Sequence, residues 1–99
     1  MTKVDTAIIG GGAAGMVSAI TAAGRRKRVL ILEKGPKLGR KILISGNGRC
    51  NVTNIEADKM DHYYSNDRDF IQGIIEKFSL EKTISFFSDL GIEFVEEKR

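Results

Sequence analysis

The sequence predicts an α/β fold that opens with a right-handed βαβ unit. Three observations lead to this prediction: an apolar run at Val4–Ile9, a glycine-rich turn directly after it, and a second apolar run at Val29–Leu32. Every position of the second run is apolar, as is typical of a parallel strand that is covered on both faces. Two parallel strands joined through a helix form a right-handed crossover.

The crossover helix is expected over Ala13–Ala23. This segment is rich in alanine, which has the highest helix propensity, and Gly24 follows it as a stop signal.

Residues 6–24 carry no charge and are long enough to suggest a membrane span or a signal peptide. Their five glycines, and an apolar content that is mostly alanine, argue against both. We therefore expect a cytoplasmic protein without membrane contact.

The net charge of +3 hides an asymmetry between the two halves of the chain. Residues 1–54 carry ten lysines and arginines against two acids, whereas residues 55–99 carry six against eleven. The basic, glycine-rich half suits an anion such as a pyrophosphate. Nucleic acid is the alternative partner, but this half contains no aromatic residue and no recognised nucleic-acid motif. Its densest basic run, Arg25–Arg28, follows the expected helix, where cations complement the helix dipole, so we expect a small-molecule substrate and no nucleic acid.

Residues 34–67 show little apolar periodicity and predict a long loop, which in a compact domain is usually functional. Two helices are expected after it. Apolar residues recur at helical spacing over 70–78, and Ser79 has the character of an N-cap before a second helix that ends at Gly91. This second helix should turn four side chains inward: Leu80, Ile84, Phe87 and Leu90.

The predicted organisation is a βαβ unit over residues 1–33, a loop over 34–67, and two helices with a strand over 68–99. The strand is expected at Ile92–Val95. A doubly wound sheet needs at least a third parallel strand beside the first one, and no such strand is predicted here. We therefore expect an incomplete domain: the N-terminal part of a longer protein, or a truncated product, without a substrate domain.

Gly10, Gly12 and Gly15 have the G-x-G-x-x-G spacing of the dinucleotide-binding fingerprint, and they stand between a strand and a helix as the fingerprint requires. The first glycine permits a tight turn, the second lets a pyrophosphate approach the backbone, and the third lets the helix pack closely on the sheet. The N–H groups at the helix start favour the anion. The predicted pyrophosphate site consists of Gly10, Gly12, Ala13, Ala14 and Gly15.

Glu33 ends the second strand, eighteen residues after Gly15. A carboxylate at this place accepts hydrogen bonds from the adenosine ribose hydroxyls and favours a free 2′-hydroxyl over a 2′-phosphate. Two alternatives stay open: a glycine-rich turn that only packs a helix onto a sheet, and a solvated acid at the strand end. The fingerprint alone does not distinguish FAD from NAD.

A second polar, glycine-rich segment follows Glu33, where an ordinary NAD-binding unit would pass into another helix. Arg40 and Lys41 could bind phosphates, since arginine can donate to two oxygens at once. Gly46 and Gly48 free the backbone between neutral hydrogen-bonding side chains at Ser45, Asn47, Asn51, Thr53 and Asn54. Such a loop suits a large polar cofactor that the chain wraps. The alternative is a surface turn rich in asparagine and glycine.

These segments resemble those of the BaiN-like (YhiN-like) family of NAD(P)/FAD-dependent flavoproteins. The resemblance rests on residues 8–16, on Glu33-Lys34 and on the block from Gly39-Arg40-Lys41 through Asn54, and it covers essentially the whole chain. It implies a Rossmann-like FAD-binding unit of the two-dinucleotide-binding-domain flavoprotein type, incomplete in this chain. It also implies an oxidoreductase that passes hydride from NAD(P)H through FAD to an unsaturated ketone such as a dehydro bile acid. Other members are described as aminoacetone-type oxidases.

For this chain the resemblance implies that FAD places its pyrophosphate at Gly10–Gly15 and its ribose at Glu33. The loop Arg40–Asn51 would run along the cofactor towards the isoalloxazine ring. The candidate cofactor-binding residues beyond the fingerprint and Glu33 are Lys34, Arg40, Lys41, Ser45, Gly46, Asn47, Gly48, Arg49, Cys50 and Asn51. The alternative hypotheses are a fragment of an NAD-dependent dehydrogenase and a truncated, non-catalytic fragment.

Neither Cys50 nor His62 is assigned a catalytic role. Cys50 is the only cysteine of the sequence, and a catalytic disulfide of a flavin enzyme needs a second one. His62 stands outside any motif and is expected in a loop. No side chain is predicted to act as a general acid or base, and no metal site is predicted.

Overall fold

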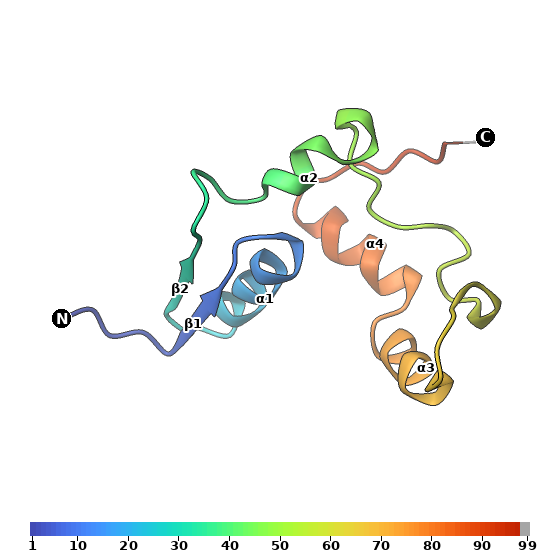
Figure 1. Ribbon diagram of the computed structural model, residues 1–99, viewed down its shortest axis with the longest axis horizontal. Coiled ribbons are helices and arrows are strands. Elements are labelled where there is room, and N and C mark those ends of the chain that lie inside the picture. Colours follow the sequence, from blue (N-terminus) through green and yellow to red (C-terminus); the bar gives the residue numbers. More distant parts are fainter. Residues whose placement is uncertain (98–99) are drawn as a thin grey trace. The chain divides into compact units, whose positions relative to one another are not determined.

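The computed structural model describes residues 1–97, drawn in Figure 1. The chain forms two compact units, residues 1–51 and residues 52–99. Their boundary lies inside the segment that the sequence predicted as a long loop.

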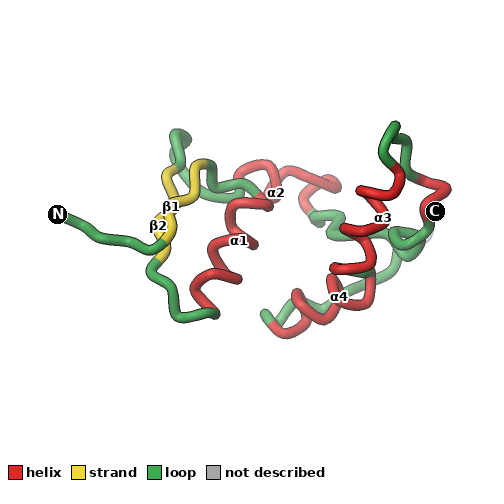
Figure 2. The backbone as a smooth tube through the Cα atoms, turned by 90° about the horizontal axis from the view of Figure 1, so that it is seen from below, coloured by secondary structure: helices red, strands yellow, loops and turns green. Residues whose placement is uncertain are grey.

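The first unit contains the predicted βαβ arrangement, which confirms the α/β fold class. Strand β1 (Thr6–Ile9) pairs in parallel with strand β2 (Val29–Leu32), and the register aligns Thr6 with Val29 and Ile9 with Leu32. Helix α1 (Ala13–Gly24) connects the strands and lies along them (Figures 1 and 2). Because the strands are parallel, the glycine-rich turn leaves the sheet at its carboxyl edge.

One face of this two-stranded sheet is covered and the other is open. Side chains alternate between half-buried and exposed along both strands, as period-two geometry requires. Ile8 faces α1, whereas Ile9 and Leu32 lie on the open side with 82% and 49% of their surface exposed. Within the first unit, α1 packs on both strands from one side, so the coverage of both faces that the sequence predicted is not found in this unit.

A short helix, α2 (Arg40–Ile44), interrupts the segment that was predicted as a loop. It begins after Gly39, whose φ of 67° lies in the left-handed region that favours glycine. A turn of 3-10 helix (Ser45–Gly48) follows, with left-handed backbone at Gly46 and Asn47. Five residues are too few for a helical repeat to be recognised in a sequence, so α2 escaped prediction.

The second unit contains both predicted helices, α3 (Arg68–Lys77) and α4 (Leu80–Asp89), after a single 3-10 turn at Met60–His62. Asp67 caps α3, because its carboxylate accepts a hydrogen bond from the N–H of Phe70 at 3.0 Å. Ser79 caps α4, as predicted, and its hydroxyl accepts from the N–H of Lys82 at 3.3 Å. His62, expected in a loop, ends the 3-10 turn.

The aromatic side chains of the second unit pack edge to face. Phe86 contacts both Phe78 and Phe87, with ring centroids 6.1 and 5.1 Å apart, and Phe87 contacts Phe94 at 6.5 Å. Leu80 and Phe87 are half-buried as predicted, but Ile84 and Leu90 are exposed to 36% and 48%. Phe78 packs instead against Phe86, which lies on a different face of α4.

The predicted strand at Ile92–Val95 is not formed. The described residues after Gly91, up to Glu97, have no regular secondary structure. A strand needs a partner for its ladder of hydrogen bonds, and the two strands in the described part of the chain pair with each other. Phe94 is half-buried through its contact with Phe87 rather than through a sheet.

Replacing Ser79 with alanine is expected to destabilise α4 by about 1 kcal/mol, because the N–H of Lys82 loses its acceptor. Circular dichroism at 222 nm during thermal unfolding measures the effect. The matched control is Ser85→Ala, an exposed serine within the same helix, which should leave the transition unchanged or raise it slightly. Equal behaviour of the two variants would contradict the capping role.

Candidate nucleotide-binding site

The glycine-rich turn is fixed to the carboxyl edge of the sheet. The N–H of Gly10 donates to the carbonyl of Leu32 at 2.8 Å, and its φ of 98° lies in the region that favours glycine. The chain then turns directly into α1. The turn is therefore an extension of the ladder between β1 and β2, and its position is set by the sheet.

Gly15 lies where α1 passes closest to the turn. A Cβ at this position would overlap the carbonyl oxygen of Gly10 and lie 3.4 Å from Cγ2 of Ile8. Both neighbours are held in place, one as backbone and the other by the sheet. The close helix–sheet approach that the fingerprint assigns to its third glycine is thus present in the structure.

Open space lies in front of Gly12. A Cβ there would meet no atom within 4 Å, and the residue is exposed. The first N–H groups of a helix have no intrahelical acceptor, and at α1 no side chain caps them and the first turn holds no acid. The start of α1, with Ala13, Ala14 and Gly15 in its first turn, can therefore receive an anion.

Glu33 joins the turn to the segment that follows β2. One carboxylate oxygen accepts from the N–H of Gly11 at 2.9 Å, and the other accepts from the N–H of Gly35 at 2.6 Å. The bond from Gly35, then that from Gly11, lower the pKa of Glu33 below its ordinary value of 4.5, and Lys34 adds a smaller effect. Each oxygen keeps a further lone pair, so the ionised carboxylate can still accept from a ligand hydroxyl.

The N–H group and the carbonyl group of Gly11 both make hydrogen bonds. Its N–H donates to Glu33, and its carbonyl accepts from the N–H of Gly39 at 2.7 Å. A Cβ on Gly11 would overlap Cδ2 of Leu38, and one on Gly39 would lie 2.9 Å from Cε of Met16. Among the described residues, Gly11 and Gly39 are the two that are fully buried. The chain after β2 is thereby tied to the glycine-rich turn.

These segments line a pocket of about 410 Å³ that is open to solvent and in the volume range of small-molecule sites. Four of its residues are basic and one is acidic, an arrangement that favours an anion carrying hydroxyl groups. Five predicted residues line it: Gly12, Glu33, Lys34, Arg40 and Lys41. Three further residues line the pocket that the sequence did not predict: Gly11, Gly35 and Lys37.

A local signal in the sequence could have identified Lys37 but not Gly11. Lys37 continues the basic series of its neighbours in the sequence. Gly11 occupies a variable position of the fingerprint, so the motif says nothing about it. Its role, like that of Gly39, depends on contacts between segments far apart in sequence, which no local pattern reveals.

The predicted residues from Ser45 to Asn51 lie outside this pocket. They form their own turn: the Ser45 hydroxyl donates to the Ile42 carbonyl at 3.0 Å, and the N–H of Cys50 donates to the Ser45 carbonyl at 3.1 Å. A Cβ on Gly46 would lie 3.1 Å from Asn51, so glycine permits this close approach. Cys50 is half-buried with a left-handed φ of 56°. The cofactor contacts expected of this segment stay predictions.

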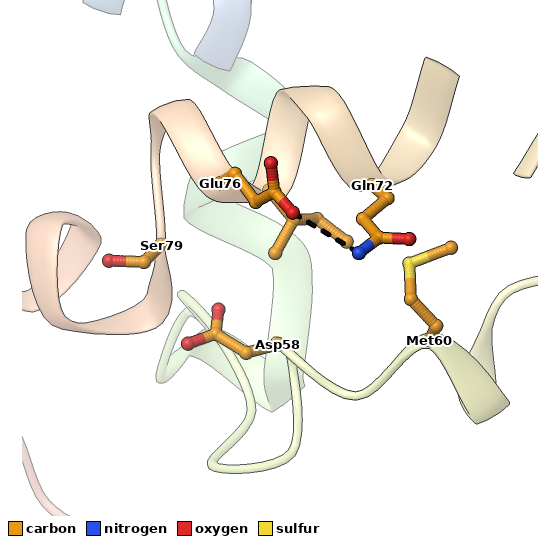
Figure 3. Close-up of a pocket in the computed structure, with 6 residues that line it drawn as sticks. Asp58, Met60, Gln72, Glu76 and Ser79 are labelled. Carbon is orange, nitrogen blue, oxygen red and sulfur yellow. Dashed lines mark hydrogen bonds between the residues drawn. The ribbon is translucent and has the colours of Figure 1, made fainter. Parts of the chain in front are cut away.

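A second, smaller pocket lies within the second unit. Its volume is about 280 Å³, and Figure 3 shows Asp58, Met60, Gln72, Glu76 and Ser79 around it. Its polar groups already have local partners. Gln72 donates to Glu76 at 3.1 Å, Asp58 accepts from the N–H of Leu80 at 2.8 Å, and Ser79 caps α4. The bonds of Asp58 and Ser79 thus belong to the start of α4, and the bond between Gln72 and Glu76 lies within α3.

Glu56 organises the exposed 3-10 turn of the second unit. Its carboxylate lies 3.1 Å from Nζ of Lys59 and 2.8 Å from Nε2 of His62. The hydrogen bond and charge of Lys59 are the main causes that lower the pKa of Glu56.

Within residues 1–97, no cluster of histidine, cysteine and acidic side chains could hold a metal ion. No helix in the same range is long and apolar enough to cross a membrane.

The chain is similar to known proteins over nearly its whole length. The model of the HI0933-like protein Rossmann domain matches residues 4–99. A 3-dehydro-bile acid delta(4,6)-reductase of Clostridium scindens is 45% identical over 87 residues, and a ribosomal RNA dihydrouridine synthase of Haemophilus influenzae is 37% identical over 94 residues. A 3-oxosteroid 1-dehydrogenase of Mycolicibacterium smegmatis is 30% identical over 95 residues.

These matches cover 86%, 95% and 94% of the chain, respectively. They cover 21%, 23% and 17% of the three relatives. The chain therefore spans about a fifth of the length of the curated relatives that it matches.

Proposed function

Because the chain belongs to the HI0933-like protein Rossmann domain family, as its motifs predicted, we propose that it is the FAD-binding portion of a flavin-dependent oxidoreductase. The observation that carries the proposal is the basic pocket beside the uncapped start of α1, closed by Glu33. The names of two relatives, a reductase and a dehydrogenase, support redox chemistry.

The residues of the pocket fit the adenosine diphosphate part of FAD. The space in front of Gly12 and the free N–H groups of α1 suit a pyrophosphate, and Lys34, Arg40 and Lys41 add positive charge beside it. Glu33 offers acceptor oxygens for the ribose hydroxyls. In this proposal the segment Ser45–Asn51 continues along the cofactor towards its flavin ring.

FAD, when bound, supplies the acceptance and return of hydride, while the protein binds and orients it. The chain's own contribution is to hold the pyrophosphate at the start of α1 and to fix the ribose through Glu33. The N–H groups of Gly35 and Gly11 lower the pKa of Glu33, which further favours the ionised form needed in this role. No described side chain is assigned to proton transfer.

We further propose NAD(P)H as the electron donor and a small unsaturated ketone as the substrate; the name of the bile acid reductase relative supports the substrate class. An RNA uridine is the second candidate substrate, supported by the dihydrouridine synthase relative and by the exposed run Arg25–Arg28.

The single cysteine favours the reducing environment of the cytoplasm. An NAD-dependent dehydrogenase is the less favoured hypothesis, because the second glycine-rich segment is not needed for NAD.

A titration with FAD, followed by quenching of flavin fluorescence, tests the proposed cofactor. Saturable quenching is expected, with NAD a poor competitor. Gly12→Asp should weaken binding by at least about tenfold, because its carboxylate would occupy the anion position. The variant should still fold, since its Cβ meets no atom within 4 Å. Binding of NAD in place of FAD would contradict the proposal.

A further inference from the structure

The run Arg25–Arg28, here called the basic loop, lies at the edge of the sheet opposite to the nucleotide pocket. It connects the end of α1 to the start of β2. The N–H groups of Asp5 and Thr6, at the start of β1, both donate to the carbonyl of Arg28, at 2.9 and 3.2 Å. The glycine-rich turn leaves the other end of the same strands, so a ligand of the basic loop would be separate from the cofactor.

Helix capping does not account for these four cations. The carbonyl of Ala22 accepts from the N–H groups of Arg25 and Lys27 at 3.0 and 3.2 Å, and the carbonyl of Ala23 accepts from the N–H of Arg26 at 3.0 Å. Two carbonyls at the end of α1, those of Ala22 and Ala23, are thus satisfied by backbone donors. The last turn of the helix contains no basic residue. The charged side chains are free for another role.

Local acids neutralise one of the four cations. Asp5 accepts from the backbone N–H of Arg28 at 2.8 Å, and its carboxylate lies 3.9 Å from Nε of the same arginine. Across residues 1–97 no ion pair joins Arg25, Arg26 or Lys27 to a carboxylate, and all three are exposed. Glu33, the other acid of the first unit, is held at the opposite edge by Gly11 and Gly35.

The backbone of Arg26 adds an independent observation. Its φ of 62° lies in the left-handed region, which is uncommon for a residue other than glycine, asparagine or aspartate. Glycine would fit this turn with less strain. An arginine therefore stands where the backbone alone favours another residue.

We propose that the basic loop contacts the phosphates of an RNA backbone, an inference that rests on the RNA candidate of the proposed function. Arginine forks fit phosphate oxygens, and three cations without local partners would release counterions on binding. No aromatic side chain adjoins the loop for base stacking, so the contact is to the backbone and independent of sequence. A lipid surface is less suitable because residues 21–28 contain no large apolar side chain to insert.

The test is fluorescence anisotropy with a labelled oligouridylate of about 12 nucleotides, titrated at several salt concentrations. The triple variant R25Q/R26Q/K27Q removes the three free cations and keeps Arg28 with its Asp5 partner. The slope of log affinity against log salt should become shallower by about 2, from about 0.7 for each of three lost phosphate contacts. Affinity at low salt should fall by at least about tenfold.

Arg26→Gly separates binding from folding. It should make the slope shallower by about 0.7, while its unfolding temperature stays unchanged or rises because glycine fits the left-handed backbone. A fall in RNA affinity with no loss of stability would support a direct contact. An unchanged salt slope in both variants would overturn the proposal.

The nucleotide pocket provides the competing explanation for RNA binding. Saturating FAD should not displace the oligouridylate, and K34Q/K37Q/K41Q should retain the salt slope of the basic loop. Displacement by FAD, or loss of the slope in this pocket variant only, would overturn the proposal. So would binding to phosphatidylserine vesicles without binding to the oligouridylate. Failure of the FAD titration itself would contradict the proposed cofactor and leave the RNA result independent.

Discussion

Replacing Gly15 with alanine is expected to destabilise the first unit by about 1–3 kcal/mol and to lower FAD affinity at least about a hundredfold. The added Cβ would overlap the carbonyl oxygen of Gly10, which belongs to the backbone of the turn and is fixed by the hydrogen bond from Gly10 to Leu32. The helix must shift away from the sheet, and the N–H groups at its start then no longer point towards the pyrophosphate. Thermal unfolding and the FAD titration measure the two effects.

Gly12→Ala is the matched control for this prediction. Its Cβ enters open space, so the unfolding temperature should hold while FAD binding weakens through direct contact with the ligand. The pair therefore separates the two roles that the fingerprint assigns to its second and third glycines. Equal stability of the Gly15 and Gly12 variants would contradict the packing role of Gly15.

Replacing Glu33 with glutamine is expected to loosen the chain after β2 and to weaken FAD binding by about tenfold or more, as the loss of hydrogen bonds to a charged group implies. The carboxylate accepts from Gly11 and Gly35 on different oxygens, whereas an amide has one acceptor oxygen and one donor nitrogen. One of the two N–H groups would then face another donor. Hydrogen exchange of these two amides reports the loosening directly.

Acid should remove the same interaction from the unsubstituted protein. The folded-state pKa of Glu33 is lowered, so its stabilising effect is fully present above the ordinary value of 4.5 and is lost as the pH falls through the lower, folded value. The stability difference between the protein and Glu33→Gln should therefore be constant near neutral pH and shrink on acidification.

Glu56→Gln is the control for the charge change. The pKa of Glu56 is also lowered, mainly by Lys59, but Glu56 belongs to the second unit and is not among the residues that line the nucleotide pocket. FAD affinity should therefore stay unchanged in this variant. An equal loss of affinity in both glutamine variants would contradict a specific role for Glu33.

Local patterns in the sequence predicted the βαβ arrangement of the first unit well. The all-apolar run Val29–Leu32 is β2 to the residue, and α1 begins at the predicted Ala13 and ends one residue late. The fingerprint spacing also predicted the steric role of Gly15. These features depend on a strand, a turn and a helix that are consecutive in the chain, so residues close in sequence determine their geometry.

Features that depend on distant residues were not predictable in the same way. The role of Gly11 arises from Glu33 and Gly39, which follow it by 22 and 28 positions. The apolar pattern of α4 did not reveal that Phe78 would pack against Phe86 and that Ile84 would be exposed. The expected strand at Ile92–Val95 failed because apolar alternation supplies side chains but no pairing partner.

No apolar side chain among the described residues is fully buried. The folded fraction of this chain should therefore depend on the concentration of its ligand. A two-stranded sheet is marginally stable in water, so little free energy separates the folded and unfolded populations. A ligand that binds only the folded population adds about 2.7 kcal/mol at a concentration a hundred times its Kd. The supply of that ligand would then set the fraction of chains that survive proteolysis, which links the abundance of the protein to the abundance of its ligand.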